Sequence, residues 1–338
     1  SSGYTDAKNC MNRVPLVSII VPCYNHAQFI EERLTSIVNQ SFTDYELIIL
    51  DDASTDDSVD LIKKQLVGRD YVLHVNQVNS GSPFAQWDRG ISLATGELIW
   101  IAESDDSCSP DFLSKLVDMY EQTGASLLYS ESLLIDATGE VVGDTLCYTD
   151  NLDPYLSRYC FTWPGISFVL KYLSVQCVFP NASAVLFSRE CYEVGLMSRH
   201  NLHLSGDWLQ WIAVSSKGYV THSNEKLNYF RQHSGSVRFR TQEIVEKESL
   251  VCTQFALSFL SGNERPAFLR GVACRMRSRW RFNMPISLLT QPHVYIQKAR
   301  ILSRLMNLPI LYWGLHDATK LLLKPFALLS RWSRVGVR

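Results

Sequence analysis

The sequence contains no apolar run of about 18 residues, no Cys-x-x-Cys pair, no internal repeat and no low-complexity tract. Without such an apolar run, we expect no membrane-spanning helix. The nine cysteines are odd in number and scattered, which argues against both a disulfide framework and a structural zinc site. The polar first residues do not resemble a signal peptide. These absences favour a protein of the reducing cytoplasm.

What the sequence does contain is an ordinary globular composition with unevenly distributed charge. Hydrophobic residues make up 46% of the 338 residues and charged residues 20%, enough for a sizeable core. From Arg265 onward there are 14 basic residues and one acidic residue, Asp317. Subtracting these from the totals of 32 and 34 leaves 18 basic and 33 acidic residues before that point. This split predicts different roles for the two parts.

Short apolar segments alternate with amphipathic segments in the first part of the chain. The predicted strands span 17–21, 45–50, 71–75 and 98–102, and the predicted helices span 27–40, 58–67 and 87–95. This alternation predicts an α/β fold, in which helices cover both faces of a mostly parallel, Rossmann-like central sheet. Ligands bind beyond the carboxyl ends of strands in such sheets, and polar clusters follow three of the predicted strands there.

The pattern changes after residue 109. A helix is predicted from Pro110 to Gly124, then strands near 125–135 and 183–187, with a hairpin turn at 137–139. Further helices are predicted over 243–260 and, as a basic C-terminal α-helical region, within 266–338.

Three carboxylates crowd together at the end of the fourth predicted strand: Glu103, Asp105 and Asp106. Residues two apart in an extended strand share a face, so Glu103 and Asp105 are expected to point together. Oxygen ligands on one face suit Mg²⁺ or Mn²⁺, which complete their shell with water and substrate phosphates. A bound cation also relieves the repulsion between the acids. The structural alternative is that the aspartates cap the helix beginning near Pro110.

Three segments together carry a family resemblance. Residues 17–25 (VSIIVPCYN), 41–56 (SFTDYELIILDDASTD) and 96–106 (GELIWIAESDD) resemble the family 2 glycosyltransferases. The resemblance implies a GT-A fold and an inverting transferase that uses a nucleotide-sugar donor, with Mn²⁺ or Mg²⁺ as cofactor. We expect four parts: a polar tail of partly artificial origin (1–14), a nucleotide-sugar-binding half (15–125), an acceptor-binding half (126–240) and a basic helical region (241–338). The resemblance is dense over 15–120, sparser to about 240 and absent beyond 265.

The resemblance also implies roles for the residues after the first two strands. Pro22, Tyr24 and Asn25 form the first nucleotide loop, with Tyr24 near the base. The alternative for Tyr24 is a core aromatic at a strand end. Asp52 matches the carboxylate that accepts a hydrogen bond from the base.

Glu103-Ser104-Asp105 occupies the family's Asp-x-Asp position. Asp105 is the expected metal ligand. Glu103 is longer than the usual Asp and is expected to act through water or on the ribose, while Asp106 is expected to be structural. Ser104, between the two acids, is counted with the residues that bind the nucleotide-sugar.

Asn79, Gly81 and Arg89 match the segment that runs under the donor. The family commonly has small residues and Asn there, whereas this chain has QWDR at 86–89. Asp88 or Arg89 is a candidate contact to the sugar or the uracil. A salt-bridged helix face is the structural alternative, and the sequence does not decide between the two.

Inverting transfer needs a general base on the acceptor hydroxyl and a cation at the leaving diphosphate. Residues 204–211 (LSGDWLQW) resemble the family's acceptor-site element, so Asp207 is the expected base. The alternative is that Asp207 only favours the N-terminus of a helix. Residues 229–238 resemble the loop that closes over the diphosphate. There Arg231 is expected to bind phosphate, and His233 to bind phosphate or the metal.

The expected partners are a nucleotide-sugar donor, by default a UDP-sugar, and a saccharide or lipid-linked saccharide acceptor in cell-surface polysaccharide biosynthesis. The helices of 266–338 fit an anionic surface at the inner face of the membrane, packing on the catalytic domain, or a homodimer. Nucleic acid is not expected, because the basic residues alternate with aliphatic ones. The competing interpretation is a non-catalytic module of the same fold that binds nucleotide-sugar or glycan, or acts as a scaffold.

Overall fold

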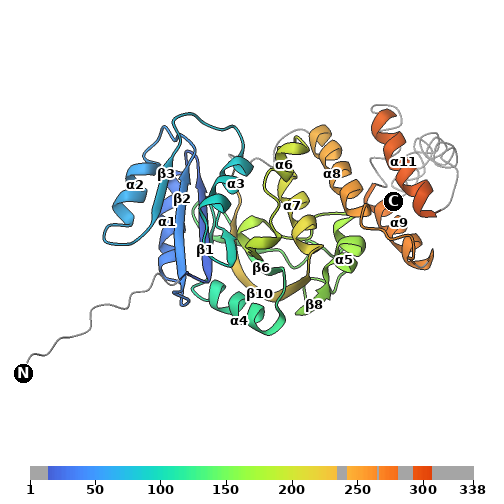
Figure 1. The fold of residues 1–338 in the computed structure, drawn as a ribbon, viewed down its shortest axis with the longest axis horizontal. Coiled ribbons are helices and arrows are strands. Elements are labelled where there is room, and N and C mark those ends of the chain that lie inside the picture. Colours follow the sequence, from blue (N-terminus) through green and yellow to red (C-terminus); the bar gives the residue numbers. More distant parts are fainter. Residues whose placement is uncertain (1–13, 234–241, 265, 281–291, 307–338) are drawn as a thin grey trace, which may run out of the picture. The chain divides into compact units, whose positions relative to one another are not determined.

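The computed structural model describes residues 14–233, 242–264, 266–280 and 292–306 (Figure 1). The chain divides into two compact units. One is formed by Ser1–Gly165 with Phe179–Ser236, and the other by Ile166–Val178 with Val237–Arg338. The first unit holds the sheet and all the predicted site residues, so it is the unit in which a candidate active site is sought.

The first unit is built on a mixed sheet. Its strands are β1 Val17–Cys23, β2 Tyr45–Asp51, β3 Val72–Val75, β4 Leu98–Ile101, β5 Ser107–Cys108, β6 Leu127–Ile135, β7 Val141–Asp144, β8 Phe161–Pro164, β9 Val185–Ser188 and β10 Tyr219–Arg231. Within the described residues the order is β3-β2-β1-β4-β9-β6-β10-β5, with β7 on β6 and β8 on β10. The neighbours from β3 to β4 are parallel, as are β6 and β10, whereas β9 is antiparallel to both its neighbours. The predicted α/β fold with a mostly parallel sheet is confirmed.

Helices cover both faces of this sheet. The helices of the first unit are α1 Ala27–Val38, α2 Ser58–Gln65, α3 Pro83–Leu93, α4 Phe112–Thr123, α6 Leu196–Arg199 and α7 Gly206–Ser215. A short helix, α5 Gly165–Phe168, begins at the last residue of this unit's first segment. On one face, Leu34 of α1 and Leu116 of α4 share a buried core with Ile19 of β1. On the other face, Ile20 meets α3 at Gly90, where an added Cβ would lie 2.5 Å from Ile20 Cγ2. Successive β1 residues thus face opposite helix layers, as a two-residue period requires.

Two strands differ from their predicted form. β1 continues through Pro22 to Cys23 instead of ending before the proline. The pairing of β1 with β4 ends at Ile20, so the missing N–H of Pro22 removes no ladder hydrogen bond on that side. β10 spans 13 residues that were not predicted as a strand, and it includes residues 229–231 of the predicted phosphate loop. Residues 234–238 of that loop lie outside the described residues.

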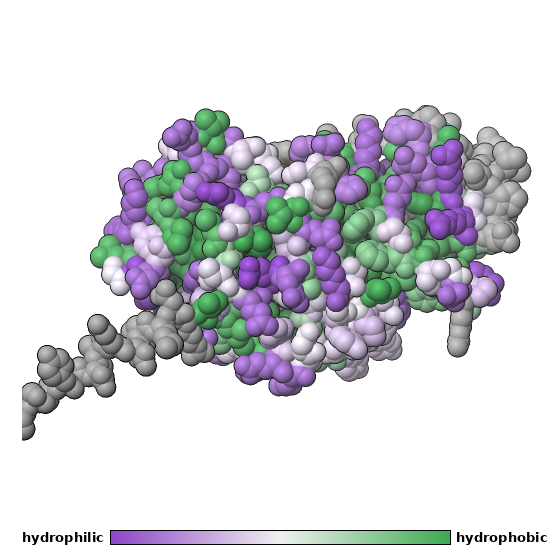
Figure 2. All heavy atoms as spheres, viewed as in Figure 1, coloured by the Kyte–Doolittle hydropathy of each residue, from purple (hydrophilic) through white to green (hydrophobic). Residues whose placement is uncertain are grey.

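The second unit is helical in the residues that the structure describes. It contains a π-helical turn at Val169–Leu173 and the helices α8 Gln242–Leu257, α9 Pro266–Trp280 and α11 Pro292–Met306. The buried Lys298 ammonium pairs with Glu246 at 3.4 Å and lies over the Trp280 ring. No helix among the described residues is long and apolar enough to cross a membrane. On the face drawn in Figure 2, hydrophobic and hydrophilic side chains are interspersed. Residues 281–291 and 307–338 of the predicted basic helical region lie outside the described residues.

Candidate active site

Two loops meet where β1 and β2 end. The Asn25 N–H donates to Ser54 Oγ at 2.9 Å, and Asn25 Oδ1 accepts from the Thr55 N–H at 2.8 Å. Asn25 has a φ of 53°, a left-handed conformation that Asn tolerates better than most residues. Tyr24 is 46% exposed, which rules out the alternative of a core aromatic. Pro22 is buried within β1, whereas Tyr24 and Asn25 are the exposed residues of this loop.

The Asp52 carboxylate holds the segment that precedes α3. Its Oδ1 accepts from Asn76 Nδ2 at 2.6 Å, the Ser80 N–H at 2.9 Å and Gln86 Nε2 at 2.8 Å. Its Oδ2 accepts from Ser80 Oγ at 2.8 Å. Four donors therefore converge on one buried carboxylate. Oδ2 has a single donor among the described residues, so it is the oxygen that could accept the predicted hydrogen bond from a nucleotide base.

Asn79 and Gly81 shape the turn beside Asp52. Asn79 Nδ2 donates to the Asp52 carbonyl at 3.0 Å, and Asn79 Oδ1 accepts from the Gly81 N–H at 2.7 Å. Gly81 has a φ of 73°, which disfavours any side chain there. Both residues set the backbone of the turn, and their contact with a donor stays a prediction.

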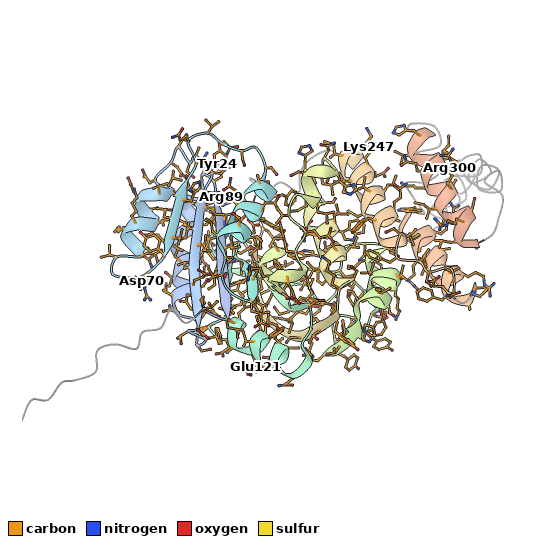
Figure 3. All side chains as sticks on the ribbon, in the orientation of Figure 1. Tyr24, Asp70, Arg89, Glu121, Lys247 and Arg300 are labelled. Carbon is orange, nitrogen blue, oxygen red and sulfur yellow. The ribbon has the colours of Figure 1, made fainter. Side chains whose placement is uncertain are left out.

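The two charged residues of α3 have different surroundings. Asp88 accepts from the Tyr192 hydroxyl at 2.8 Å and from the Gly195 N–H at 3.1 Å, so it ties α3 to the segment before α6. Arg89 is exposed, and Figure 3 shows it on α3 below Tyr24, toward the upper end of the sheet in that view. The structure therefore favours Arg89 over Asp88 as the side chain that a ligand can reach.

Glu103 makes a contact that its sequence position did not predict. The indole N–H of Trp87 donates to Glu103 Oε1 at 3.0 Å. Burial, and then the negative charge of Asp105, raise the pKa of Glu103 to about 8. The Trp87 ring lies 5.7 Å from the ring of Trp211 in α7, so Glu103 is connected through Trp87 to the helix that carries Asp207. Its predicted contact with water or ribose stays a prediction.

Asp105 lies among imidazoles. His233 Nε2 donates to Asp105 Oδ2 at 3.0 Å, and the His26 ring lies 6.2 Å from that of His233. Burial tends to raise the pKa of Asp105, but the His233 hydrogen bond and the positive charge on both histidines outweigh it and lower that pKa. The same hydrogen bond raises the pKa of His233. Ser104 is buried, and its Oγ lies 2.7 Å from His26 Nδ1. This hydrogen bond fixes the orientation of the His26 ring.

Both carboxylate oxygens of Asp106 accept hydrogen bonds from the protein. Its Oδ2 accepts from Asn181 Nδ2 and from Ser183 Oγ, each at 2.6 Å, and its Oδ1 accepts from the Arg231 N–H at 2.9 Å. The Arg33 guanidinium lies 3.9 Å away. Burial and the charge of Asp105 raise the pKa of this carboxyl. These contacts agree with the expected structural role of Asp106.

Arg231 lies in different surroundings from those predicted for it. It is the last residue of β10 and is buried. Its Nε donates to the Asp105 carbonyl at 2.7 Å, its Nη1 donates to the Asp136 carbonyl at 2.9 Å, and its Nη2 pairs with Glu32. All three nitrogens are thus engaged, and the guanidinium lies over the Phe29 ring. This placement supports anchoring of the acidic motif to α1 and β10 and does not support the predicted phosphate contact.

Asp207 lies in the first turn of α7, as the resemblance implies. Its Oδ1 accepts from the Trp208 N–H at 2.7 Å, a contact that also fits the alternative of a helix-start residue. The preceding Gly206 packs against Phe84 of α3, where an added Cβ would lie 2.4 Å from the ring. This close approach places the start of α7 beside the helix that also carries Trp87.

The donor set fits the divalent cation that the resemblance implies. Asp105 offers carboxylate oxygen and His233 offers imidazole nitrogen, a combination suited to Mn²⁺. Within the described residues, no three His, Cys, Asp or Glu side chains lie close enough to hold an ion by themselves. Asp105 and His233 would then supply one or two ligands to a cation, which is the usual arrangement where substrate phosphates and water complete the shell.

Comparison with known proteins identifies the family. The model described as Glycosyl transferase family 2 matches residues 18–169. This chain belongs to that family. TuaG of Bacillus subtilis (strain 168), a glycosyltransferase assigned to teichuronic acid biosynthesis, is 25% identical over 273 residues, which cover 78% of this chain and 94% of TuaG. Chondroitin synthase of Escherichia coli is 31% identical over 135 residues, which cover 40% of this chain and 20% of the synthase.

Solved structures show the same fold. The crystal structure of S. aureus TarS 1–349 superimposes with a TM-score of 0.58 at 15% identity, covering 86% of this chain and 80% of that one. The expected GT-A fold is thus confirmed. As a family 2 member, the chain is a glycosyltransferase that transfers a sugar from a nucleotide sugar.

Several site residues escaped sequence reasoning. His26 directly follows the predicted nucleotide loop, so its position at a strand end was a usable signal. Arg33 is buried within the apolar stripe of α1, where its charge was the signal, and its Nε donates to the Glu103 carbonyl at 2.8 Å. Trp87 gave no signal, because an indole in an amphipathic helix is usually a core residue.

Proposed function

We propose that this chain is an inverting, divalent-metal-dependent transferase that moves a sugar from a UDP-sugar to a saccharide or lipid-linked saccharide acceptor in cell-surface polysaccharide biosynthesis. The observation that carries the proposal is the pairing of Asp105 with His233, next to His26 and the exposed Tyr24 loop. Of the three crowded acids, Asp105 is the one with imidazole neighbours, while Asp106 is held by protein donors.

Each residue has a distinct role in this proposal. Asp105 and His233 hold the cation, which when bound neutralises the leaving diphosphate. Tyr24 packs on the nucleotide base. Asp207 removes the proton from the acceptor hydroxyl, which then attacks the anomeric carbon from the face opposite the leaving group. Arg89 contacts the donor from α3, and the turn at Asn79 and Gly81 supports it.

The relatives support the donor and acceptor classes. TarS has been crystallised with UDP-GlcNAc. The poly(ribitol-phosphate) β-glucosyltransferase of Bacillus spizizenii is 32% identical over 126 residues, 36% of this chain. Together with TuaG, these names point to polymers of the cell surface. UDP is the proposed donor nucleotide because TarS has been crystallised with UDP and with UDP-GlcNAc.

Release of UDP from a panel of UDP-sugars tests the proposal. The wild-type chain is expected to release UDP from one of them in the presence of Mn²⁺ and to stop when EDTA is added. The Asp105→Asn variant should lose the activity, whereas Asp70→Asn, at an exposed aspartate on the opposite end of the sheet in Figure 3, should not. Full activity in Asp105→Asn would show that the metal assignment is wrong.

The base assignment has its own test. Asp207→Asn preserves the shape of the helix start but removes the group that accepts the proton. It should bind the donor as the wild type does, measured by the rise in melting temperature, and should lose transfer to the acceptor. Wild-type turnover in Asp207→Asn would eliminate Asp207 as the base. Donor binding without turnover in the wild type would instead favour the non-catalytic module.

A further inference from the structure

Exposed tyrosines gather on one loop outside the acidic motif. Residues 145–160, which join β7 to β8 and are called the tyrosine loop below, carry Tyr148, Tyr155 and Tyr159. Tyr155 is 66% exposed and Tyr159 is 61% exposed, and their ring centroids lie 6.1 Å apart at an interplanar angle of 34°. Aromatic rings lower the free energy most when they are removed from water, so a paired display on the surface points to a ligand.

The tyrosine loop is held from beneath. Thr149 Oγ1 and Ser157 Oγ are 2.8 Å apart and both are buried, so they close the loop on itself. Leu156, between the two exposed tyrosines, is buried and anchors the segment. At the start of the loop, Thr145 Oγ1 donates to Glu131 Oε2 of β6 at 2.5 Å. A surface fixed in this way loses little conformational entropy when it binds a ligand.

Polar groups lie next to the two rings. Arg158 Nη1 and Nη2 contact the two Asp150 oxygens at 2.8 and 3.1 Å, and both side chains are partly exposed. The loop is fixed to β10, because Asn224 Nδ2 donates to the Arg158 carbonyl at 3.0 Å and His222 Nδ1 donates to the Tyr159 carbonyl at 2.9 Å. The surface thus combines two aromatic faces with a bidentate ion pair that has donors and acceptors at its rim.

A sugar ring has the complementary chemistry. One face of a pyranose presents C–H groups, which carry partial positive charge, and its edge carries hydroxyls. The negative π face of a tyrosine attracts such C–H groups, while Arg158 and Asp150 can donate to and accept from the hydroxyls. The ion pair has no net charge, so it offers nothing specific to an anionic lipid surface. We propose that the tyrosine loop is a second, remote saccharide-binding site that holds the distal part of the acceptor chain.

The position of the loop sets the length of its ligand. His222, which binds Tyr159, lies nine residues before Arg231 on β10, and the Arg231 N–H contacts Asp106 of the acidic motif. β10 bulges between these two residues, and their partners on β6, Tyr129 and Ile135, are only six residues apart, so the span is about 20 Å. A saccharide that reaches both places therefore has several sugar units, and short acceptors do not reach the tyrosine loop. The proposal depends on the saccharide acceptor proposed above.

Binding to a printed microarray of bacterial surface polysaccharides and their mono- and disaccharide fragments tests this inference. The full chain is expected to bind polysaccharide spots and not the short fragments. The Tyr155→Ala/Tyr159→Ala double variant should bind the same spots about tenfold more weakly, as expected for the loss of two aromatic contacts. The Tyr155→Phe/Tyr159→Phe variant keeps both rings and should retain binding. Tyr219→Ala, an exposed tyrosine outside the loop, is the matched control.

Three results would overturn the inference: no binding of the wild type to any spot, equal binding by the alanine double variant, or a change of that variant from dimer to monomer in light scattering, which would identify a protein interface. Thermal unfolding of each variant checks that it folds. UDP release by the wild type is measured separately, so a wild type that binds polysaccharide without releasing UDP counts against the proposed function alone.

Discussion

The hydrogen bond between Trp87 and Glu103 makes a quantitative prediction. The Trp87 indole donates to Glu103 Oε1 at 3.0 Å, and the Trp87 ring is 2% exposed. Glu103→Asp removes one methylene and withdraws the carboxyl by about 1.5 Å, so the donor–acceptor distance rises to about 4.5 Å and the bond is lost. The variant has the Asp-x-Asp form that the family usually has, yet it should be less stable than the wild type.

The size of the effect follows from what the lost bond leaves behind. A hydrogen bond contributes ~1 kcal/mol net, and a buried donor left without a partner costs about 1–3 kcal/mol. We therefore expect Glu103→Asp to lower the free energy of unfolding by about 2 kcal/mol, or the melting temperature by about 4–8 °C. In a double-mutant cycle in urea, Glu103→Asp and Trp87→Phe should be non-additive by ~1 kcal/mol, because each removes the same bond.

Trp211 supplies the matched control. It is fully buried next to Trp87, and its indole nitrogen has no hydrogen-bond partner among the described residues. Trp211→Phe removes a similar ring volume but no hydrogen bond, so it should cost less than Trp87→Phe. If the two tryptophan variants are equally destabilised and the cycle is additive, the indole–carboxyl bond does not contribute and the reasoning fails.

Two further predictions concern α3. Gly90→Ala should lower the free energy of unfolding by about 1–3 kcal/mol, because its Cβ would lie 2.5 Å from Ile20. The control Gly271→Ala, in an open part of α9, should stabilise its helix by up to ~1 kcal/mol. Urea unfolding measures both variants, and an unchanged stability of Gly90→Ala would contradict the close approach of α3 to β1. Arg89→Ala should raise the KM for the UDP-sugar without changing the melting temperature. Asp88→Asn should lower the melting temperature, because it weakens the contacts with Tyr192 and Gly195. A lower melting temperature in Arg89→Ala with a raised KM in Asp88→Asn would exchange the two roles.

The first half of the sheet could be predicted because its strands are apolar on both faces and its helices have an apolar stripe. Ile19 and Ile20 point to opposite layers and are both fully buried, so the strand is visible in the sequence as a continuous apolar run. β10 has no such run. Its residues Asn228 and Arg231 are buried, and their polar groups are satisfied by hydrogen bonds to Ser132 and to Asp136, respectively. No periodicity in the sequence shows that these polar groups have partners.

The hydrogen-bond partners of the site residues could not be predicted either. The sequence predicted Asp52 and Asp105 at the carboxyl ends of strands, and His233 through the resemblance of residues 229–238 to a family loop. It did not show how many protein donors each acid meets, since those donors come from segments distant in the chain. Asp52 meets donors from three residues after β3, and this occupancy determines how much of the carboxylate is left for a ligand.

The crowding of the acids is resolved by separate partners, which supports the proposed divalent cation. Glu103 turns to the Trp87 indole, and Asp106 turns to Ser183 and the Arg231 backbone. Burial, and then the negative charge of the ionised Asp105, raise the pKa of both of these carboxyls. Asp105 has only His233 as a side-chain donor among the described residues, and its side chain remains 23% exposed. An ionised carboxylate beside an imidazole that can also bind metal is the arrangement that attracts a divalent cation.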